Sequence, residues 1–253
     1  TREAIAYEKA GIFRAKIPAV IGDINPPKSL IEQSVSKNTP LLRINHEFNF
    51  QHKGDSWAWA CFGENPQQYE SLPKPALKGE HQYRNASSVL MAVTEMQSLL
   101  TVSEQSIHSG LQAINLKGRF QLVEADIPVL LDVAHNPQAV TALFSYLQTE
   151  FSGKTIHAVF AMMKDKDITG VIDIIKPVIK DWFFAPLNNP RAVSEVAMKA
   201  CFRQSELEHV SFGFENFSEA YLAAEKNADV GDLILIFGSF FLVSEYLAKT
   251  TNT

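Results

Sequence analysis

Cysteine is scarce in this sequence: Cys61 and Cys201 are the only two among 253 residues, and neither belongs to a C-x-x-C pair. This usage argues against a disulfide framework and a cysteine-based zinc site, and it is typical of a protein in a reducing compartment. A surplus of positive charge is also missing, because 28 acidic and 23 basic residues leave a formal net charge of -5. The composition therefore does not indicate a general nucleic-acid-binding surface.

Long hydrophobic runs are missing as well. The longest apolar stretch, Leu233–Val243, contains Gly238 and Ser239 and is too short to cross a bilayer. No signal peptide is visible, so we expect a cytoplasmic protein with no membrane partner. The first residue is Thr1, within a stretch that looks helical, and we therefore expect the back part of a longer protein.

Three glycine-based motifs do not occur in the sequence. There is no G-x-x-x-x-G-K-[ST] P-loop, no G-x-G-x-x-G fingerprint and no G-x-S-x-G elbow. The first absence excludes a P-loop within this chain. The second argues against a dinucleotide-binding site, and the third argues against an α/β-hydrolase nucleophile.

The second half of the chain alternates between short apolar runs and amphipathic stretches. The predicted strands are residues 120–124, 129–133, 157–161, 182–185, 210–212 and 233–237, and the predicted helices are residues 138–150, 168–179, 194–202, 217–226 and 240–248. Apolar strands between amphipathic helices indicate an α/β fold, here a Rossmann-like, mostly parallel six-stranded sheet with helices on both faces. The first strand has a short connection to the second, so we expect it to pair antiparallel at an edge.

The first half of the chain has a different pattern. We expect helices at residues 2–13, 27–37, 85–100 and 103–113, a short strand at 18–21, and a small antiparallel hairpin formed by 41–50 and 57–62. Trp57 and Trp59 are interpreted as packing residues, with stacking on a nucleobase as the alternative. The pattern changes at Lys117-Gly118, which predicts domains at residues 1–116 and 117–253.

Polar side chains follow the predicted strands of the second half. Asp132, His135 and Asn136 come directly after the apolar run 129–131, and Pro137 suits the first turn of a helix. Residues 164–167, 186–191 and 238–239 occupy the same position after three further strands. Because ligands bind beyond the carboxyl ends of parallel strands, these junctions predict one binding rim. The alternative is that the acid and the amides only satisfy turn backbone.

Two further positions, Arg119 and Gly238-Ser239, suit an anionic ligand. Arg119 follows a glycine between the two halves, where its fork of donors could reach phosphates. Gly238-Ser239 opens a predicted helix, where free N–H groups attract carboxylate or phosphate. Alternatively, Ser239 is only a helix cap.

Seven short stretches resemble one family of enzymes. They are EKAGIF (8–13), GEHQYRNA (79–86), GRFQ (118–121), LDVAHNP (131–137), KDKDI (164–168), NPR (189–191) and GSF (238–240). D-x-A-H-N-P is typical of the Mur ligase superfamily, and the EKAGIF, HQ-x-x-NA and GRFQ stretches narrow the resemblance to its folate branch, the dihydrofolate and folylpolyglutamate synthases. The resemblance covers nearly the whole chain and implies the tail of a P-loop-type ATPase domain in residues 1–116 and a ligase domain in 117–253.

The resemblance also implies a reaction. It is ATP-dependent amide formation, in which a carboxylate of dihydropteroate or of a folate glutamate becomes an acyl phosphate that L-glutamate attacks. Phosphorylation supplies the leaving group that a carboxylate lacks, and the developing negative charge calls for cations. The implied cofactors are ATP and Mg²⁺, with K⁺ as a candidate second cation. The implied partners are the small-molecule substrates alone, and we expect the protein to be a monomer. Because the family's P-loop lies upstream of these residues, we expect the chain alone to be inactive.

Site residues follow from the same resemblance. Asn85 is expected to contact the adenine, or otherwise to be only an N-cap. Arg119 would face the ATP phosphates, Asp132 would bind ATP through the ribose hydroxyls, and His135 would orient phosphate or the incoming glutamate. Lys9 would hold magnesium after carbamylation; the alternative is an ordinary surface lysine.

Five further residues of the predicted rim are assigned to binding the incoming glutamate or to domain closure: Lys164, Asp165, Lys166, Arg191 and Ser239. Two other functions stay open. One is a peptidoglycan Mur ligase with a UDP-sugar acceptor, and the other is a non-catalytic nucleotide-binding or protein-interaction module, which the missing P-loop would favour.

Overall fold

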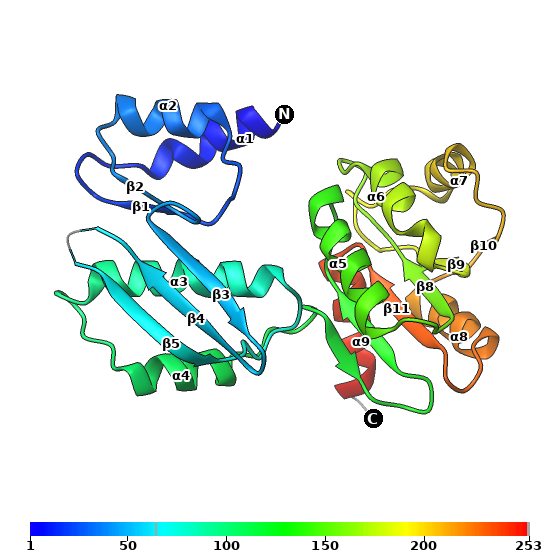
Figure 1. Cartoon of the computed structure of the whole chain (residues 1–253). Helices are drawn as coiled ribbons and strands as arrows, with labels where there is room; N and C mark the ends of the chain where they lie inside the picture. The colour runs from blue at the N-terminus through cyan, green and yellow to red at the C-terminus, as the bar shows by residue number, and fades with distance from the viewer. Residues whose placement is uncertain (64, 252–253) are drawn as a thin grey trace. The chain divides into compact units, whose positions relative to one another are not determined.

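The structure, a computed structural model, describes residues 1–63 and 65–251 and consists of two compact units (Figure 1). The first unit comprises Thr1–Asn115, and the second begins at Leu116. Within the described ranges, every helix is too short or too polar to cross a membrane. Cys61 and Cys201 are both free thiols.

The first unit opens with a small α/β element. It contains α1 (Arg2–Lys9), a short 3₁₀ turn (Ala10–Ile12), β1 (Ala19–Ile21), α2 (Lys28–Ser36) and β2 (Leu41–Arg43). The Thr1 hydroxyl caps α1 by accepting a hydrogen bond from the N–H of Ala4. β1 and β2 pair in parallel, and α2 provides the connection between them.

An antiparallel sheet of three strands follows, in the order β3 (Phe48–Lys53), β4 (Ser56–Cys61) and β5 (Gln67–Pro73). Burial alternates along β4, where Trp57, Trp59 and Cys61 point into the core. Helices α3 (His81–Met96) and α4 (Glu104–Ala113) contribute Leu90 and Ile107 to the same core. The two indole N–H groups donate to backbone carbonyls, which confirms the packing interpretation of these tryptophans.

Three expectations for the first unit differ from the structure. Residues 41–50 do not form one strand, because β2 pairs with β1 and only β3 joins the antiparallel sheet. The hairpin gains a third strand, β5, which the sequence analysis does not predict. Helix α3 begins four residues before Asn85, so Asn85 is not an N-cap. The predicted cap of α4 is confirmed, since the Ser103 hydroxyl accepts from the N–H of Ser106.

The second unit is built on the six-stranded sheet. Its strands are β6 (Gln121–Val123), β7 (Val129–Asp132), β8 (Ile156–Phe160), β9 (Asp181–Phe184), β10 (Val210–Ser211) and β11 (Leu233–Phe237), arranged in the order β10-β9-β8-β11-β7-β6. All neighbouring pairs are parallel except β6 with β7. The predicted mostly parallel sheet and its antiparallel edge strand are therefore confirmed.

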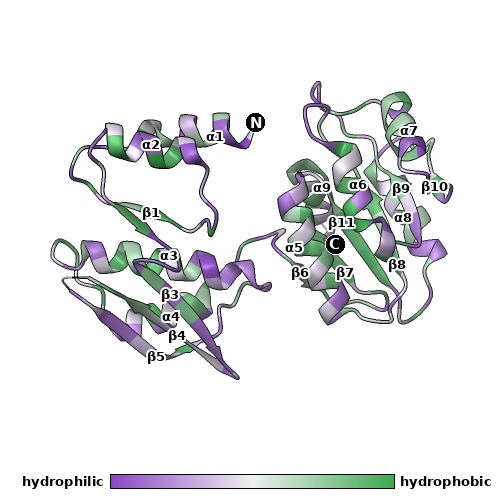
Figure 2. Cartoon of the chain, turned by 45° about the horizontal axis from the view of Figure 1, so that its top comes forward, coloured by the Kyte–Doolittle hydropathy of each residue, from purple (hydrophilic) through white to green (hydrophobic). Residues whose placement is uncertain are grey.

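Helices cover both faces of this sheet. The five helices are α5 (Pro137–Glu150), α6 (Ile168–Ile175), α7 (Glu195–Gln204), α8 (Phe217–Asn227) and α9 (Phe240–Thr251), with a 3₁₀ turn (Lys176–Val178) after α6. One core contains residues of α5, α6 and α7, and the other contains residues of α8 and α9. Every residue of β7, β8 and β11 is buried, and Figure 2 shows these strands mainly in the hydrophobic colour. Burial on both faces explains why these strands are continuous apolar runs.

Candidate functional site

The carboxyl ends of four neighbouring strands meet at one edge of the large sheet. Strands β9, β8, β11 and β7 are adjacent and parallel, so the connections that follow them leave the sheet on the same side. The ends of these strands and the connections that follow them carry all but one of the site residues predicted for the second unit; the exception is Arg119, which precedes β6. This edge is the candidate site, because parallel sheets bind ligands beyond the carboxyl ends of their strands.

Asp132, the last residue of β7, holds the turn that carries Arg119. Its two carboxylate oxygens accept hydrogen bonds from the N–H groups of Phe120 (3.1 Å) and Ala134 (2.8 Å). Both neighbours of Arg119 are left-handed, with φ of 69° at Gly118 and 44° at Phe120. Left-handed backbone is costly for a bulky residue such as Phe120, so the hydrogen bond from its N–H to Asp132 helps to maintain the turn.

The same carboxyl group is almost completely buried, with 4% of Asp132 exposed. Burial raises the pKa of Asp132 to about 6, while the two backbone N–H donors and the Arg119 charge act in the opposite direction. Asp132 is therefore largely ionised at pH 7 and carries a buried negative charge in the turn. Shifted pKa values of this kind are enriched at functional sites.

Arg119 and His135 both lie against the ring of Phe240, the first residue of α9. The guanidinium carbon of Arg119 is 5.3 Å from the ring centroid of Phe240, over its face. The His135 and Phe240 ring centroids are 6.1 Å apart. The structure thus brings Arg119, Asp132 and His135 together, although they come from two different connections.

The orientation of His135 follows from one hydrogen bond. Its Nδ1 lies 2.8 Å from the carbonyl oxygen of Val133, and a carbonyl only accepts, so Nδ1 carries a proton. In the neutral ring Nε2 is then the acceptor, available to a ligand O–H or N–H group. The neighbouring Asn136 is occupied as the cap of α5, since its side chain accepts from the N–H of Ala139.

A second group of polar residues follows β8 and β9. Both carboxylate oxygens of Asp165 accept from the Arg191 guanidinium, at 3.0 and 3.1 Å, and Lys166 Nζ lies 3.3 Å from the same carboxylate. These cations, Arg191 first, lower the pKa of Asp165. Lys164 Nζ donates to the carbonyl oxygen of Pro190. The four predicted residues of this group are therefore brought together, and three of them are exposed to solvent.

Ser239 is buried at the start of α9. Its hydroxyl accepts a hydrogen bond from the N–H of Phe241 at 3.2 Å, as a helix cap does. The preceding Gly238 has φ of 105°, and a Cβ at this position would lie 2.4 Å from the carbonyl oxygen of Ala161. Only glycine allows β11 to turn into α9 so close to the end of β8.

Asn85 lies in the first unit, on the exposed side of α3. Its Nδ2 donates to the side-chain oxygen of Gln82, 3.0 Å away. Both residues line a cavity of about 310 Å³ whose other walls are mainly apolar and come from α3 and α4. Apolar walls with a few polar groups are the usual construction of a small-molecule pocket.

Lys9 also belongs to the first unit and is exposed at the end of α1. It lines a cavity of about 470 Å³, together with residues of β1 and the loop that precedes it. Within residues 1–63 and 65–251, no three His, Cys, Asp or Glu side chains are grouped so that they could hold a metal ion. The described side chains alone therefore do not form a ready metal site.

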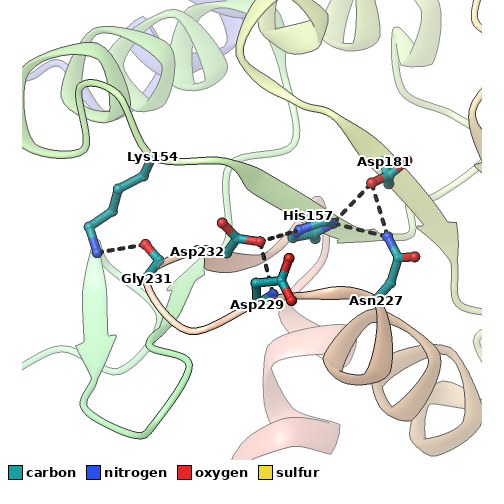
Figure 3. Close-up of polar contacts among 7 residues, drawn as sticks. All are labelled: Lys154, His157, Asp181, Asn227, Asp229, Gly231 and Asp232. Atoms are coloured by element: carbon teal, nitrogen blue, oxygen red, sulfur yellow. Dashed lines mark hydrogen bonds and ion pairs between the residues drawn. The ribbon is translucent and has the colours of Figure 1, made fainter.

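The sequence analysis missed a buried histidine at the opposite edge of the large sheet. His157 near the start of β8 is fully buried, with Nδ1 3.1 Å from Asp181 and Nε2 3.0 Å from Asp232 (Figure 3). Asn227, the last residue of α8, donates to the same Asp181 carboxylate. This cluster joins the amino ends of three strands, away from the candidate site, and we interpret it as structural. Nothing in the local sequence around His157 indicates it, because its partners lie 24 and 75 residues along the chain.

Comparison with known proteins finds relatives over nearly the whole chain. Residues 118–240 match the family model "Mur ligase, glutamate ligase domain". The dihydrofolate synthase/folylpolyglutamate synthase of Escherichia coli K12 is 34% identical over 248 residues, which are 97% of this chain and 55% of the relative. The chain thus spans about half the length of the curated relatives it matches.

Two solved structures resemble the chain closely. E. coli FolC in complex with DHPP and ADP has a TM-score of 0.87 at 31% identity, covering 100% of this chain and 57% of that one. The bifunctional Yersinia pestis enzyme complexed with AMPPNP and Mn ion has a TM-score of 0.85 at 33% identity, covering 99% and 57%. The chain is therefore a homologue of the dihydrofolate synthase/folylpolyglutamate synthases over nearly its whole length, and its residues 118–240 match the glutamate ligase domain of the Mur ligases.

Proposed function

We propose that this chain is the C-terminal part of an ATP-dependent ligase that adds L-glutamate to dihydropteroate or to folate glutamates, forming ADP and phosphate. The observation that carries the proposal is the grouping of Arg119, Asp132 and His135 at the carboxyl end of β7, within the segment that matches a glutamate ligase domain. Residues 1–116 would then belong to the ATPase domain, and residues 117–253 to the ligase domain.

Arg119 would bind the phosphates of ATP. Its guanidinium lies over an aromatic ring, and this contact leaves the in-plane N–H donors available for a bidentate contact with phosphate oxygens. Asp132, ionised at pH 7, retains acceptor capacity on its oxygens that suits the ribose hydroxyls. The same carboxylate orients Arg119 through the turn, so a single residue would serve both the sugar and the phosphates.

Asn85 and the apolar cavity beside it suit the adenine. A flat base buries its faces between aliphatic walls, and an amide both donates to and accepts from its edge. His135 would orient phosphate or the amine of the incoming glutamate through Nε2, because Nδ1 is already engaged. Lys164, Lys166 and Arg191 would attract the two carboxylates of that glutamate, although Asp165 now neutralises part of their charge.

A divalent cation bound together with ATP would neutralise part of the negative charge of the phosphates. The Yersinia pestis relative was solved with Mn ion, and we propose Mg²⁺ as the physiological ion, with K⁺ as a second cation. Lys9 would contribute a ligand only as a carbamate, since its ammonium repels cations. Native mass spectrometry of the full-length protein near neutral pH under carbon dioxide should show one added CO₂, about 44 Da, as expected for a carbamate that acid would destroy. A single unmodified mass under these conditions would contradict this role.

We propose that the natural full-length protein is a cytoplasmic monomer. The proposed activity is tested by measuring ADP release by this protein. ADP release should require L-glutamate together with dihydropteroate or tetrahydrofolate. Release with a UDP-sugar acceptor instead would favour a peptidoglycan Mur ligase, and no release with any acceptor would favour a non-catalytic binding module. Arg119→Ala should raise the KM for ATP more than tenfold, as expected when a charged hydrogen bond worth about 1.5–3 kcal/mol is lost, whereas the exposed Arg203→Ala should not.

A further inference from the structure

Phe240 is a large aromatic residue whose position is not explained by the hydrophobic core. It is 52% exposed and belongs to neither of the two cores of the second unit. Nevertheless it opens α9 directly after Ser239, at the edge where the candidate site lies. An exposed aromatic ring gains little from burial, so its contacts must be sought in the site itself.

The ring of Phe240 is shared by two residues of that site. Arg119 lies over its face at 5.3 Å, and the His135 ring lies 6.1 Å away with the two planes inclined at 53°. The three side chains come from three separate connections: the turn before β6, the β7–α5 connection and the β11–α9 connection. Phe240 is therefore the aromatic contact through which these connections meet.

We propose that Phe240 is a positioning residue, which holds the Arg119 guanidinium in the orientation that meets the nucleotide phosphates. The proposal rests on the proposed function and adds a residue to it. A long arginine side chain populates many rotamers, and each one that misses the phosphates reduces affinity. Contact with the ring face selects among them, while the N–H donors in the guanidinium plane stay available for phosphate.

The expected size of the effect follows from the exposure of the pair. An exposed cation–π contact is worth about 0.5–1 kcal/mol, which corresponds to about a two- to fivefold change in the population of one orientation. Because the phosphates are bound in the ground state as well as in the transition state, the change should appear in the KM for ATP and leave kcat unaltered.

The experiment compares four forms of the full-length protein: the wild type, Phe240→Leu, Phe240→Tyr and Phe241→Leu. Phe241 is the matched control, since it is the next residue of α9, is 53% exposed and has no cation or ring contact within the described parts of the chain. The first readout is the NMR signal of the Arg119 Nε–H group, which the nearby ring shifts. The second readout is steady-state kinetics with ATP as the varied substrate.

Phe240→Leu should move the Arg119 signal and raise the KM for ATP about two- to fivefold at constant kcat, as the loss of one exposed cation–π contact predicts. Phe240→Tyr keeps an aromatic ring, so its Arg119 signal and its KM for ATP should be close to those of the wild type. Phe241→Leu should change neither the signal nor the KM. An unchanged Arg119 signal in Phe240→Leu would overturn the proposal, as would an equal rise in KM in Phe241→Leu. A wild-type protein that turns over no ATP with any acceptor would overturn the proposed function, and the positioning role with it, even with the NMR contact present.

Discussion

Replacing Asp132 by Asn should remove a pH-dependent loss of stability from the second unit. Burial raises the pKa of this carboxyl group from 3.8 to about 6. A difference of about two pKa units corresponds to about 3 kcal/mol of free energy, at about 1.36 kcal/mol for each unit. Ionised Asp132 therefore destabilises the folded domain by roughly this amount, compared with the protonated group.

The direction of the pH dependence follows from the order of the two pKa values. Since the folded-state pKa lies above the unfolded one, the folded protein binds more protons than the unfolded chain between about pH 4 and about pH 6. The free energy of unfolding should consequently fall as the pH rises through this window. Below and above the window the contribution of Asp132 is constant, because both states are then equally protonated.

Urea unfolding of wild type and Asp132→Asn between pH 4 and pH 7 measures this contribution. An amide has nearly the same shape and does not ionise, so the variant should gain about 3 kcal/mol relative to wild type as the pH rises from about 4 to about 7. Asp126→Asn is the control, since Asp126 is exposed in the connection between β6 and β7. The carboxyl ¹³C signal that disappears in Asp132→Asn should titrate near pH 6 in wild type. A midpoint near pH 4, with parallel stability curves for the two proteins, would refute the argument.

Three further predictions concern stability alone. His157→Leu should lower the free energy of unfolding by about 2 kcal/mol, because it leaves two partly buried carboxylates without this hydrogen-bond partner. His46→Ala, at an exposed site, should change it little. Gly238→Ala should lower the free energy of unfolding by about 3 kcal/mol, through backbone strain and steric overlap of the new Cβ together. Gly231→Ala, with the same φ of 105° but open space around it, should lower it by about 1 kcal/mol, and thermal unfolding measures both changes. Ser103→Ala should cost about 1 kcal/mol through the lost cap of α4, and an unchanged Tm would contradict the role of that cap.

The large sheet could be predicted from the sequence because its strands are buried on both faces. Such strands are apolar at every position, and β11 has the bounds predicted for it, Leu233–Phe237. The strand β5 was missed because its sequence, QQYESLP, contains only one fully buried residue, Leu72. The start of α3 was missed for a similar reason, since no side chain caps it and no local signal marks the helix before Asn85.

The candidate site was predictable only in part. The position of polar residues after parallel strands predicts that Asp132, His135, Arg191 and Lys164 share one edge, because topology alone brings those connections together. The contact of Arg119 with Phe240 depends on how two turns approach each other in space. No spacing in the sequence encodes that approach, so it required the structure.

The position of β11 has a consequence for how the molecule is made. This strand is the last one that the described residues contribute to the sheet, yet it lies in the middle, between β8 and β7. Until the ribosome has delivered it, β7 and β8 each expose an unpaired apolar edge, and such edges invite association with other chains. A nascent or prematurely terminated polypeptide that stops before Leu233 would therefore form two unjoined half-sheets prone to aggregation, and it would also lack the Phe240 ring that contacts Arg119.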